Sequence, residues 1–136
     1  MLDVQKTAID GVLIITPKRL VDERGFFVAS YNADLLKEKT GIADNFVQDN
    51  HSMSIKVGTI RGLHYQAPPR GQSKLVRVLR GAITDVAVDA RKGSPTYGRH
   101  VSVKLSAENG VQLYVPVGFL HGIAALEPHT EIAYKC

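Results

Sequence analysis

Most of the chain consists of short segments in which apolar and polar residues alternate. Such alternation places every second side chain on the same face of a β-strand. Turn-forming residues, mainly Gly, Pro, Asn and Asp, separate the segments. The pattern predicts strands at 12–15, 46–52, 59–66, 74–79, 83–89, 101–105, 112–115, 122–126 and 131–134. Many short strands at this spacing indicate an antiparallel sandwich or barrel, in which alternate residues line an internal pocket.

A single short segment has the features of an α-helix. Asn32 is suited to the N-cap position, residues 33–39 fill the segment, and Gly41 is suited to end it. No other segment has a comparable start and stop signal. The sequence therefore predicts an all-β fold with one short helix.

Two of the predicted strands flank Arg80 and Gly81, which we interpret as the two-residue turn of a β-hairpin. In that register Lys74 and Asp85 are diagonal neighbours on a face that is otherwise mostly apolar. Two interpretations stay open. The two charges form an ion pair at the surface, or they are buried as a pair in the mouth of the barrel, where a charge is tolerated only with a partner.

The composition narrows the classes of function. The chain has 136 residues, 44% hydrophobic and 22% charged, which is ordinary for one folded domain spanning residues 1–136. No apolar run is long enough to cross a membrane, and the first residues lack the apolar core of a signal peptide. The single cysteine, Cys136, excludes an intrachain disulfide and a cysteine-based metal site. We therefore expect a cytoplasmic domain without membrane contact.

The charge of the chain is moderately basic. A formal net charge of +4 can attract a small phosphorylated ligand. Lys and Arg do not gather in a run, however, and tryptophan is absent. We therefore expect no nucleic-acid partner.

Two spacings of glycine, proline and histidine stand out. In the first, His64 lies six positions after Gly58. The second consists of Gly110, Pro116, Gly118 and His121. Gly and Pro suit the bends at barrel corners, and each histidine lies on a strand that can face the lumen. Together the spacings resemble the two signature motifs of the cupin superfamily, and this resemblance implies a double-stranded β-helix, or jelly-roll barrel.

The same region departs from the pattern of a metal-binding cupin. Such proteins usually have a second histidine two positions after the first, and this chain has Gln66 there. The acidic ligand expected a few residues later is absent from residues 67–71. Because two histidines alone rarely hold a transition metal, we expect neither a metal nor another cofactor. His64 and His121 are then either free imidazoles for proton transfer or histidines with a structural role.

Six longer motifs follow one another along the chain. They are DERGFF (22–27), FVQDNHS (46–52), RGLHYQ (61–66), KLVR (74–77), DVAVD (85–89) and PVGFLHG (116–122). In this order they resemble the motifs of the dTDP-4-dehydrorhamnose 3,5-epimerase family. The resemblance implies an isomerase that inverts C3, C5 or both in a nucleotide-linked 4-keto-6-deoxy sugar, as in dTDP-L-rhamnose biosynthesis. A base removes a proton beside the ketone, an enolate forms, and an acid returns a proton to the opposite face, with no need for a metal.

The resemblance also implies roles for individual residues. His64 would be the base, Lys74 would stabilise the enolate oxygen, and Tyr134 would be the opposing acid. Arg24 and Arg61 would bind the nucleotide diphosphate, because the fixed donor geometry of arginine suits phosphate. Other pocket positions are matched by Phe27, Gln48, Asn50 and His121. The residues alone also allow a rim aromatic at Tyr134 and solvated surface charges at Arg24 and Arg61.

Two features depart from the family pattern. Ala29 stands where many members have an acidic residue that helps to recognise the nucleotide base. The chain ends at Cys136, whereas typical members continue further and there supply an aspartate that is paired with the catalytic histidine. Asp85 is the candidate to orient His64 instead. We therefore expect a domain that is short at its C-terminus relative to the family and that turns over slowly.

The resemblance further implies a homodimer that exchanges N-terminal strands between its subunits. The apolar strand at 12–15 is compatible with such an exchange. Three functions stay open. The chain is a sugar-nucleotide epimerase or a close relative, a non-catalytic sugar-nucleotide-binding cupin that has lost the catalytic pair, or a metal cupin of the oxidase or isomerase type, against which Gln66 counts.

Overall fold

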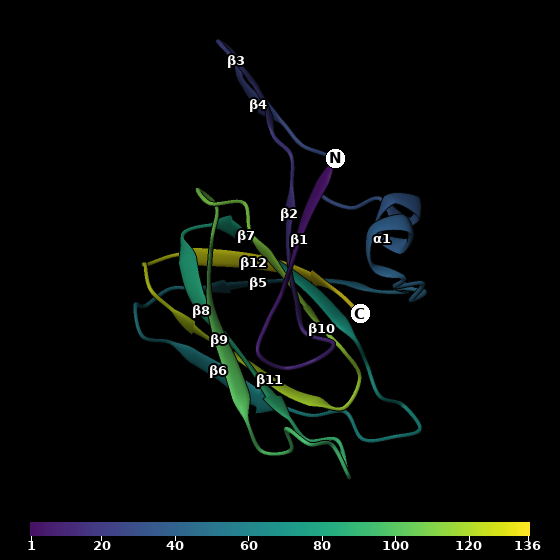
Figure 1. Ribbon diagram of the computed structural model, residues 1–136. Coiled ribbons are helices and arrows are strands. Elements are labelled where there is room, and N and C mark those ends of the chain that lie inside the picture. The colour runs from purple at the N-terminus through teal and green to yellow at the C-terminus, as the bar shows by residue number, and fades with distance from the viewer.

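Two antiparallel sheets face each other in the computed structural model, which describes residues 1–136 (Figure 1). The larger sheet has the strand order β1 (Leu2–Lys6), β2 (Leu13–Pro17), β10 (Gln112–Val115), β7 (Lys74–Arg80), β12 (Thr130–Lys135) and β5 (Asp49–Ser54). The smaller sheet has the order β6 (Ile60–His64), β11 (Phe119–Ala125), β8 (Ala82–Asp89) and β9 (His100–Ser106). This arrangement confirms the predicted all-β jelly-roll fold.

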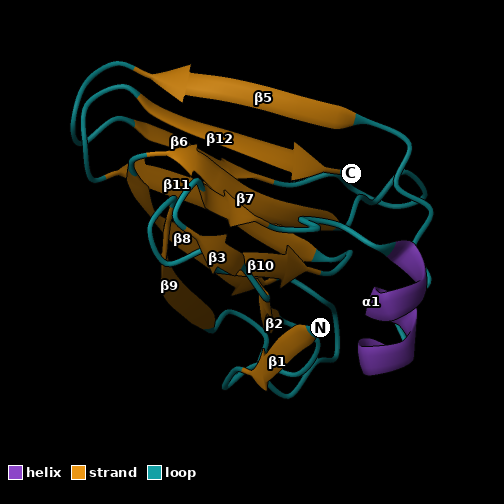
Figure 2. Ribbon diagram, turned by 90° about the horizontal axis from the view of Figure 1, so that it is seen from above, coloured by secondary structure: helices purple, strands orange, loops and turns teal.

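The single helix, α1 (Ala33–Thr40), confirms the helix expected from the capping residues. The side chain of Asn32 accepts a hydrogen bond from the backbone N–H of Leu35, and Gly41 ends the helix in the left-handed region with φ of 78°. Leu36 packs against Ile15, Leu75 and Tyr114 of the larger sheet, so α1 lies beside that sheet (Figure 2). No helix of the structure has the length and apolar character needed to cross a membrane.

The prediction of a β-hairpin at Arg80 and Gly81 is wrong. β7 pairs with β10 and β12, whereas β8 pairs with β9 and β11, so the chain passes from one sheet to the other at this point. Gly81 has φ of +84°, and a Cβ there would collide with Thr130. Because alternate residues of both strands point inward, Lys74 and Asp85 still face one interior, from opposite sheets.

The space between the sheets is filled mainly by aliphatic side chains from both. Their burial is the main source of stability for a barrel of this size. The central cluster consists of Ile9, Val12, Val76, Val78, Ile83, Ala87, Val101, Leu105, Leu113, Val115, Phe119, Ile123 and Ile132. Two carboxylates, Asp85 and Asp89, are also buried on the inner face of β8. Each of them therefore needs a partner that offsets the cost of burying a charge.

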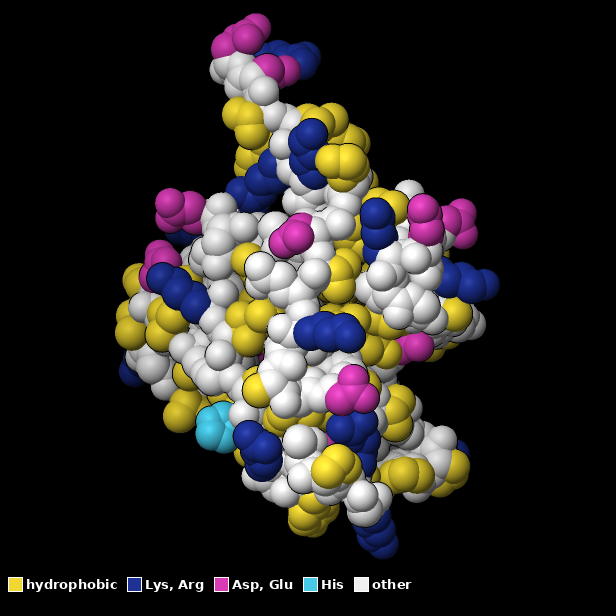
Figure 3. Space-filling view, viewed as in Figure 1, with side chains coloured by type: hydrophobic (Ala, Val, Ile, Leu, Met, Phe, Trp, Pro, Cys, Tyr) yellow, Lys and Arg dark blue, Asp and Glu magenta, His cyan; other side chains and the backbone are white.

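A short hairpin of two strands, β3 (Leu20–Asp22) and β4 (Gly25–Phe27), projects from the body of the barrel (Figures 1 and 3). We call it the arm. Its four large apolar side chains are 57% to 76% exposed, namely Leu20, Val21, Phe26 and Phe27. The strand at 13–17 pairs with β1 and β10 of its own chain. The segment that stands free is therefore the arm, and a two-stranded hairpin is only marginally stable in water by itself.

Candidate active site

A cavity of about 360 Å³ lies between the two sheets, beside their edge strands β5 and β6. Residues from five strands line it, and they come from two separate parts of the sequence, 52–74 and 121–134. The lining includes Arg61 and His64 on β6, Lys74 on β7, His121 on β11 and Tyr134 on β12. The structure therefore brings the three residues expected to be catalytic around one cavity.

A β-bulge in β6 aims two polar side chains at this cavity. Across the strand pair, Ile123 is opposite Arg61 and His121 is opposite His64. Residues three apart on a regular strand point to opposite faces, but the extra residue turns both Arg61 and His64 toward the cavity. Gly62 permits the bulge, because it has φ of +105° and a Cβ there would lie 2.6 Å from the carbonyl oxygen of His121.

The buried histidine of the site is bonded to a buried carboxylate. Nε2 of His121 lies 2.7 Å from Oδ1 of Asp85. Asp85 is opposite Ile123 in the pairing of β8 with β11, so His121 is its diagonal neighbour on the same face. Asp85 therefore does not orient His64, and that expectation is wrong. His64 itself has no carboxylate partner among these residues.

Lys74 is half-buried on the opposite wall of the cavity. Its Nζ lies 5.5 Å from the centroid of the Tyr134 ring. Burial lowers the pKa of Lys74, and negative charge at Cys136 and then at Asp85 acts in the other direction. Burial raises the pKa of Asp85, and both His121 and Lys74 oppose that change. A cation in such a poorly solvated place stabilises a nearby oxyanion far more than it would in water.

Arg61 spans the gap between the edge strands of the two sheets. Its Nε donates to Oγ of Ser54 at 3.0 Å, and its Nη2 donates to the carbonyl oxygen of Met53 at 2.9 Å, both on β5. These bonds hold the guanidinium at the cavity rim while one terminal nitrogen stays free. Such a fixed and exposed guanidinium suits a phosphate ligand.

Comparison with known proteins decides the family. The family model described as dTDP-4-dehydrorhamnose 3,5-epimerase matches residues 6–136. The chain belongs to this family. Among its relatives, the Shigella flexneri dTDP-4-dehydrorhamnose 3,5-epimerase is 53% identical over 134 residues, which are 98% of this chain and 74% of the relative.

Solved structures of the epimerase family have the same fold. The dTDP-4-dehydrorhamnose 3,5-epimerase of Bacillus anthracis, solved with TDP and pyrophosphate, has a TM-score of 0.96 at 47% identity, over 99% of this chain and 77% of that one. The Legionella pneumophila 3,5-epimerase, solved with dTDP-4-keto-L-rhamnose, has a TM-score of 0.95 at 50% identity, over 100% of this chain and 71% of that one. Both structures hold nucleotide ligands of the kind that the sequence motifs imply.

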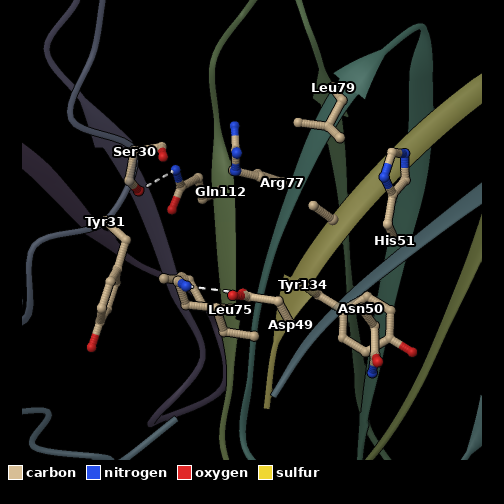
Figure 4. A pocket seen from close by; sticks show the side chains of 12 residues that line it. Ser30, Tyr31, Asp49, Asn50, His51, Leu75, Arg77, Leu79, Gln112 and Tyr134 are labelled. Atoms are coloured by element: carbon tan, nitrogen blue, oxygen red, sulfur yellow. Dashed lines mark hydrogen bonds and ion pairs between the residues drawn. The ribbon is translucent and has the colours of Figure 1, made fainter. Parts of the chain in front are cut away.

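Two further residues expected in the epimerase pocket, Gln48 and Asn50, do not line the inner cavity. Asn50 on β5 is directly opposite Tyr134 on β12, and together they line a second, larger cavity (Figure 4). Nε2 of Gln48 donates to Oδ1 of Asn50 at 2.7 Å. Tyr134 borders both cavities, so Asn50 lies beside the inner cavity through its strand partner.

The remaining two expected residues, Arg24 and Phe27, do not reach the cavity of their own chain. Both lie on the arm, where the guanidinium of Arg24 is paired with Asp22. The Arg24 side chain is 85% exposed. A single copy of this epimerase-family chain therefore lacks two of the residues that the family motifs assign to the ligand.

A second cavity of about 520 Å³ lies mostly on the outer face of the larger sheet (Figure 4). Its lining includes His51 and Arg77, and His51 is bonded to Glu131 at 3.0 Å. It contains neither His64 nor Lys74, so the residues expected to be catalytic come together only at the smaller, inner cavity. No cluster of three or more His, Cys, Asp or Glu side chains is arranged to hold a metal ion. The expected absence of a metal and a cofactor stays a prediction.

Proposed function

We propose that this chain epimerises C3, C5 or both in a dTDP-linked 4-keto-6-deoxy sugar. The observation that carries the proposal is the single cavity that holds an imidazole, an ammonium and a phenol from three strands. Membership of the epimerase family supports the reaction, and the dTDP-4-keto-L-rhamnose bound to the Legionella relative supports the class of substrate.

In the proposed reaction His64, as neutral imidazole, removes a proton from the carbon beside the C4 ketone. The electron pair moves onto the ketone oxygen, where the ammonium group of Lys74 stabilises the enolate. The hydroxyl of Tyr134 then delivers a proton to the opposite face of that carbon and becomes a phenolate. Exchange with water removes the proton from His64 and returns one to Tyr134, so the enzyme is regenerated and no atom is gained or lost.

We infer that Arg61 binds the diphosphate and that the arm of a second copy completes the nucleotide site. The four exposed apolar side chains of the arm support a partner surface. The placement of Arg24 and Phe27 outside their own cavity supports an exchange between subunits. In this homodimer the exchanged segment is the arm and not the strand at 13–17. A cytoplasmic location stays a prediction.

The reaction is proposed to need no metal. His64 and His121 are opposite each other on adjacent strands, but Asp85 is already bonded to His121 and Gln66 stands where a metal cupin has its next histidine. The metal-cupin function has no donor set to support it. Elemental analysis of the purified protein is expected to find far less than one transition metal per chain.

A non-catalytic sugar-nucleotide-binding cupin is the second candidate, because His64 has no carboxylate partner in this structure. Proton abstraction separates the two candidates directly. The protein is incubated in D₂O with a dTDP-4-keto-6-deoxy sugar, and the C3 and C5 protons are followed by NMR. Loss of either proton signal is the expected result. Binding of the nucleotide sugar with both signals unchanged would support the binding cupin and contradict the epimerase.

A further inference from the structure

The proposed reaction assigns no role to Asp85, a buried carboxylate beside the site. The side chain of Asp85 is 0% exposed, and the neighbours on its face of β8 are Ile83 and Ala87. Oδ1 is bonded to His121, but Oδ2 is buried and has no hydrogen-bond partner. A carboxylate in such a place costs stability, and an apolar residue of similar size would pack there more favourably. Its presence therefore needs a reason other than packing.

The groups around Lys74 suggest that reason. The titratable or charged side chains that line the cavity are Arg61 and His64 on β6, His121 on β11 and Tyr134 on β12, besides Lys74 itself. Two negative groups favour the ammonium form of Lys74, first Cys136 at the end of the chain and then Asp85, which is buried behind the lining. Asp85 is therefore the counter-charge of Lys74 that lies inside the barrel, and its Oδ2 has no hydrogen-bond partner.

The same carboxylate fixes the ring of His121. Because an ionised Asp85 accepts a hydrogen bond at Oδ1, Nε2 of His121 is the nitrogen that carries the proton. The other ring nitrogen, Nδ1, has no hydrogen-bond partner and is not fully buried, and His121 lines the cavity. With the proton on Nε2 alone, Nδ1 is an acceptor without a partner in a side chain that lines the cavity.

We propose that Asp85 is a positioning residue of this site, which keeps Lys74 protonated and holds His121 with Nδ1 toward a sugar hydroxyl. The proposal rests on the epimerase function and deepens it, because it assigns the second histidine to substrate orientation and not to proton abstraction. Asp85 itself does not touch the substrate. It acts through the two side chains that do.

The test compares Asp85→Asn with Asp89→Asn. Asp89 lies four residues further along β8, is equally buried, and is bonded to Arg91, Ser94 and Thr96, away from the cavity. Both variants remove one buried negative charge from the same face of the same strand. Only Asp85→Asn removes a negative charge that acts on Lys74.

The readout is the pH profile of kcat, with KM measured beside it. Loss of the negative charge lowers the pKa of Lys74 further, so the ammonium form disappears at a lower pH. We expect Asp85→Asn to move the alkaline limb of kcat to lower pH by about one unit or more and to reduce kcat at neutral pH more than it changes KM. Asp89→Asn is expected to lower the melting temperature without moving the alkaline limb of the kcat profile. An unmoved limb in Asp85→Asn would overturn the proposal.

Two NMR measurements keep the proposal testable if Asp85→Asn does not fold or if the protein has no epimerase activity. The ring nitrogens of His121 in ¹⁵N-labelled wild-type protein are expected to show a proton on Nε2 near neutral pH, and a proton on Nδ1 instead would overturn the assignment. Titration of Lys74 in ¹³C-lysine-labelled protein reports its pKa without any substrate. A failed proton-exchange assay would then contradict the proposed function alone, whereas an equal Lys74 pKa in wild-type and Asp85→Asn proteins would contradict the role of Asp85.

Discussion

Exposure separates His64 from the other two side chains of the proposed chemistry, Lys74 and Tyr134, which are both partly buried. His64 is exposed on an edge strand, so solvent can exchange its proton between turnovers. Lys74 is half-buried, and that burial strengthens its attraction for an enolate oxygen. Tyr134 packs beside Lys74 from the neighbouring strand. Each role therefore matches the solvation of the residue to which it is assigned.

Replacement of His64 by Asn is expected to abolish exchange of the sugar C–H protons. The amide cannot act as a base, and general base catalysis contributes about a hundredfold or more. Because the His64 side chain is exposed, the melting temperature should stay close to that of the wild type. Proton NMR in D₂O measures the exchange, and an undiminished rate would remove His64 from the role of base.

The Tyr134→Phe variant is expected to separate the two halves of the reaction. It keeps the aromatic ring beside Lys74 and loses only the hydroxyl that returns the proton. Deuterium should still enter the sugar from the face of His64, while the yield of inverted product falls. The two quantities are measured in the same NMR experiment. An equal loss of both would mean that Tyr134 shapes the cavity without supplying a proton.

At the scale of elements, the site depends on one irregular strand. The bulge in β6 is the reason that Arg61 and His64 share the cavity, and a regular strand would turn one of them outward. This makes Gly62 as important for the site as the residues that it separates. Position 62 requires glycine because its φ is positive and because the backbone of β11 passes close to its Cα.

Gly62→Ala is expected to destabilise the fold and to lower activity, and Gly58→Ala is its control. Both glycines have positive φ, so alanine at either site introduces strain of about 1–3 kcal/mol. Only at Gly62 would the new Cβ meet backbone, whereas nothing lies within 4 Å at Gly58. Urea unfolding and the exchange assay on both variants measure the difference. Equal effects would mean that the bulge does not position the site.

The elements also show what the sequence can and cannot predict. The strand at 112–115 and the caps of α1 were predicted correctly because their signals are local, namely alternation and capping residues. The prediction of a hairpin at Gly81 is wrong because a glycine with positive φ is equally suited to a hairpin turn and to a barrel corner. The strands of the arm were missed because neither has a buried face that would produce an alternating pattern.

The candidate site was predictable from its motifs, but its partnerships were not. The family resemblance identified His64, Lys74 and Tyr134, which share a cavity. The bond between Asp85 and His121 depends on the pairing of β8 with β11, which joins residues far apart in the sequence. The spacing of residues along the chain does not reveal which distant strands pair.

At the scale of the whole molecule, the proposed exchange of the arm would make the site a shared one. If the arm inserts into a second copy, each cavity contains His64 from one subunit and Arg24 from the other. A closed two-fold dimer then has two identical composite sites. Sedimentation velocity is expected to find a dimer at micromolar concentration.

Mixing two defective variants tests this arrangement. His64→Asn and Arg24→Ala are each expected to be impaired alone at low substrate concentration. In a mixed dimer, one site receives both defects and the other receives neither, so mixing should restore about a quarter of wild-type activity at statistical exchange. If both residues serve the cavity of their own chain, no mixture would exceed the activity of the better variant.

The position of β12 has a consequence for the order of folding. This strand lies between β7 and β5 in the larger sheet, although it is the last of the three in the chain. Until it docks, β5 has no neighbour in that sheet and the cavity lacks one wall. Closing such distant contacts is slow, because chain entropy is lost before the contacts form. A chain emerging from the ribosome would therefore carry every early motif of the family and still have no closed cavity until β12 is released.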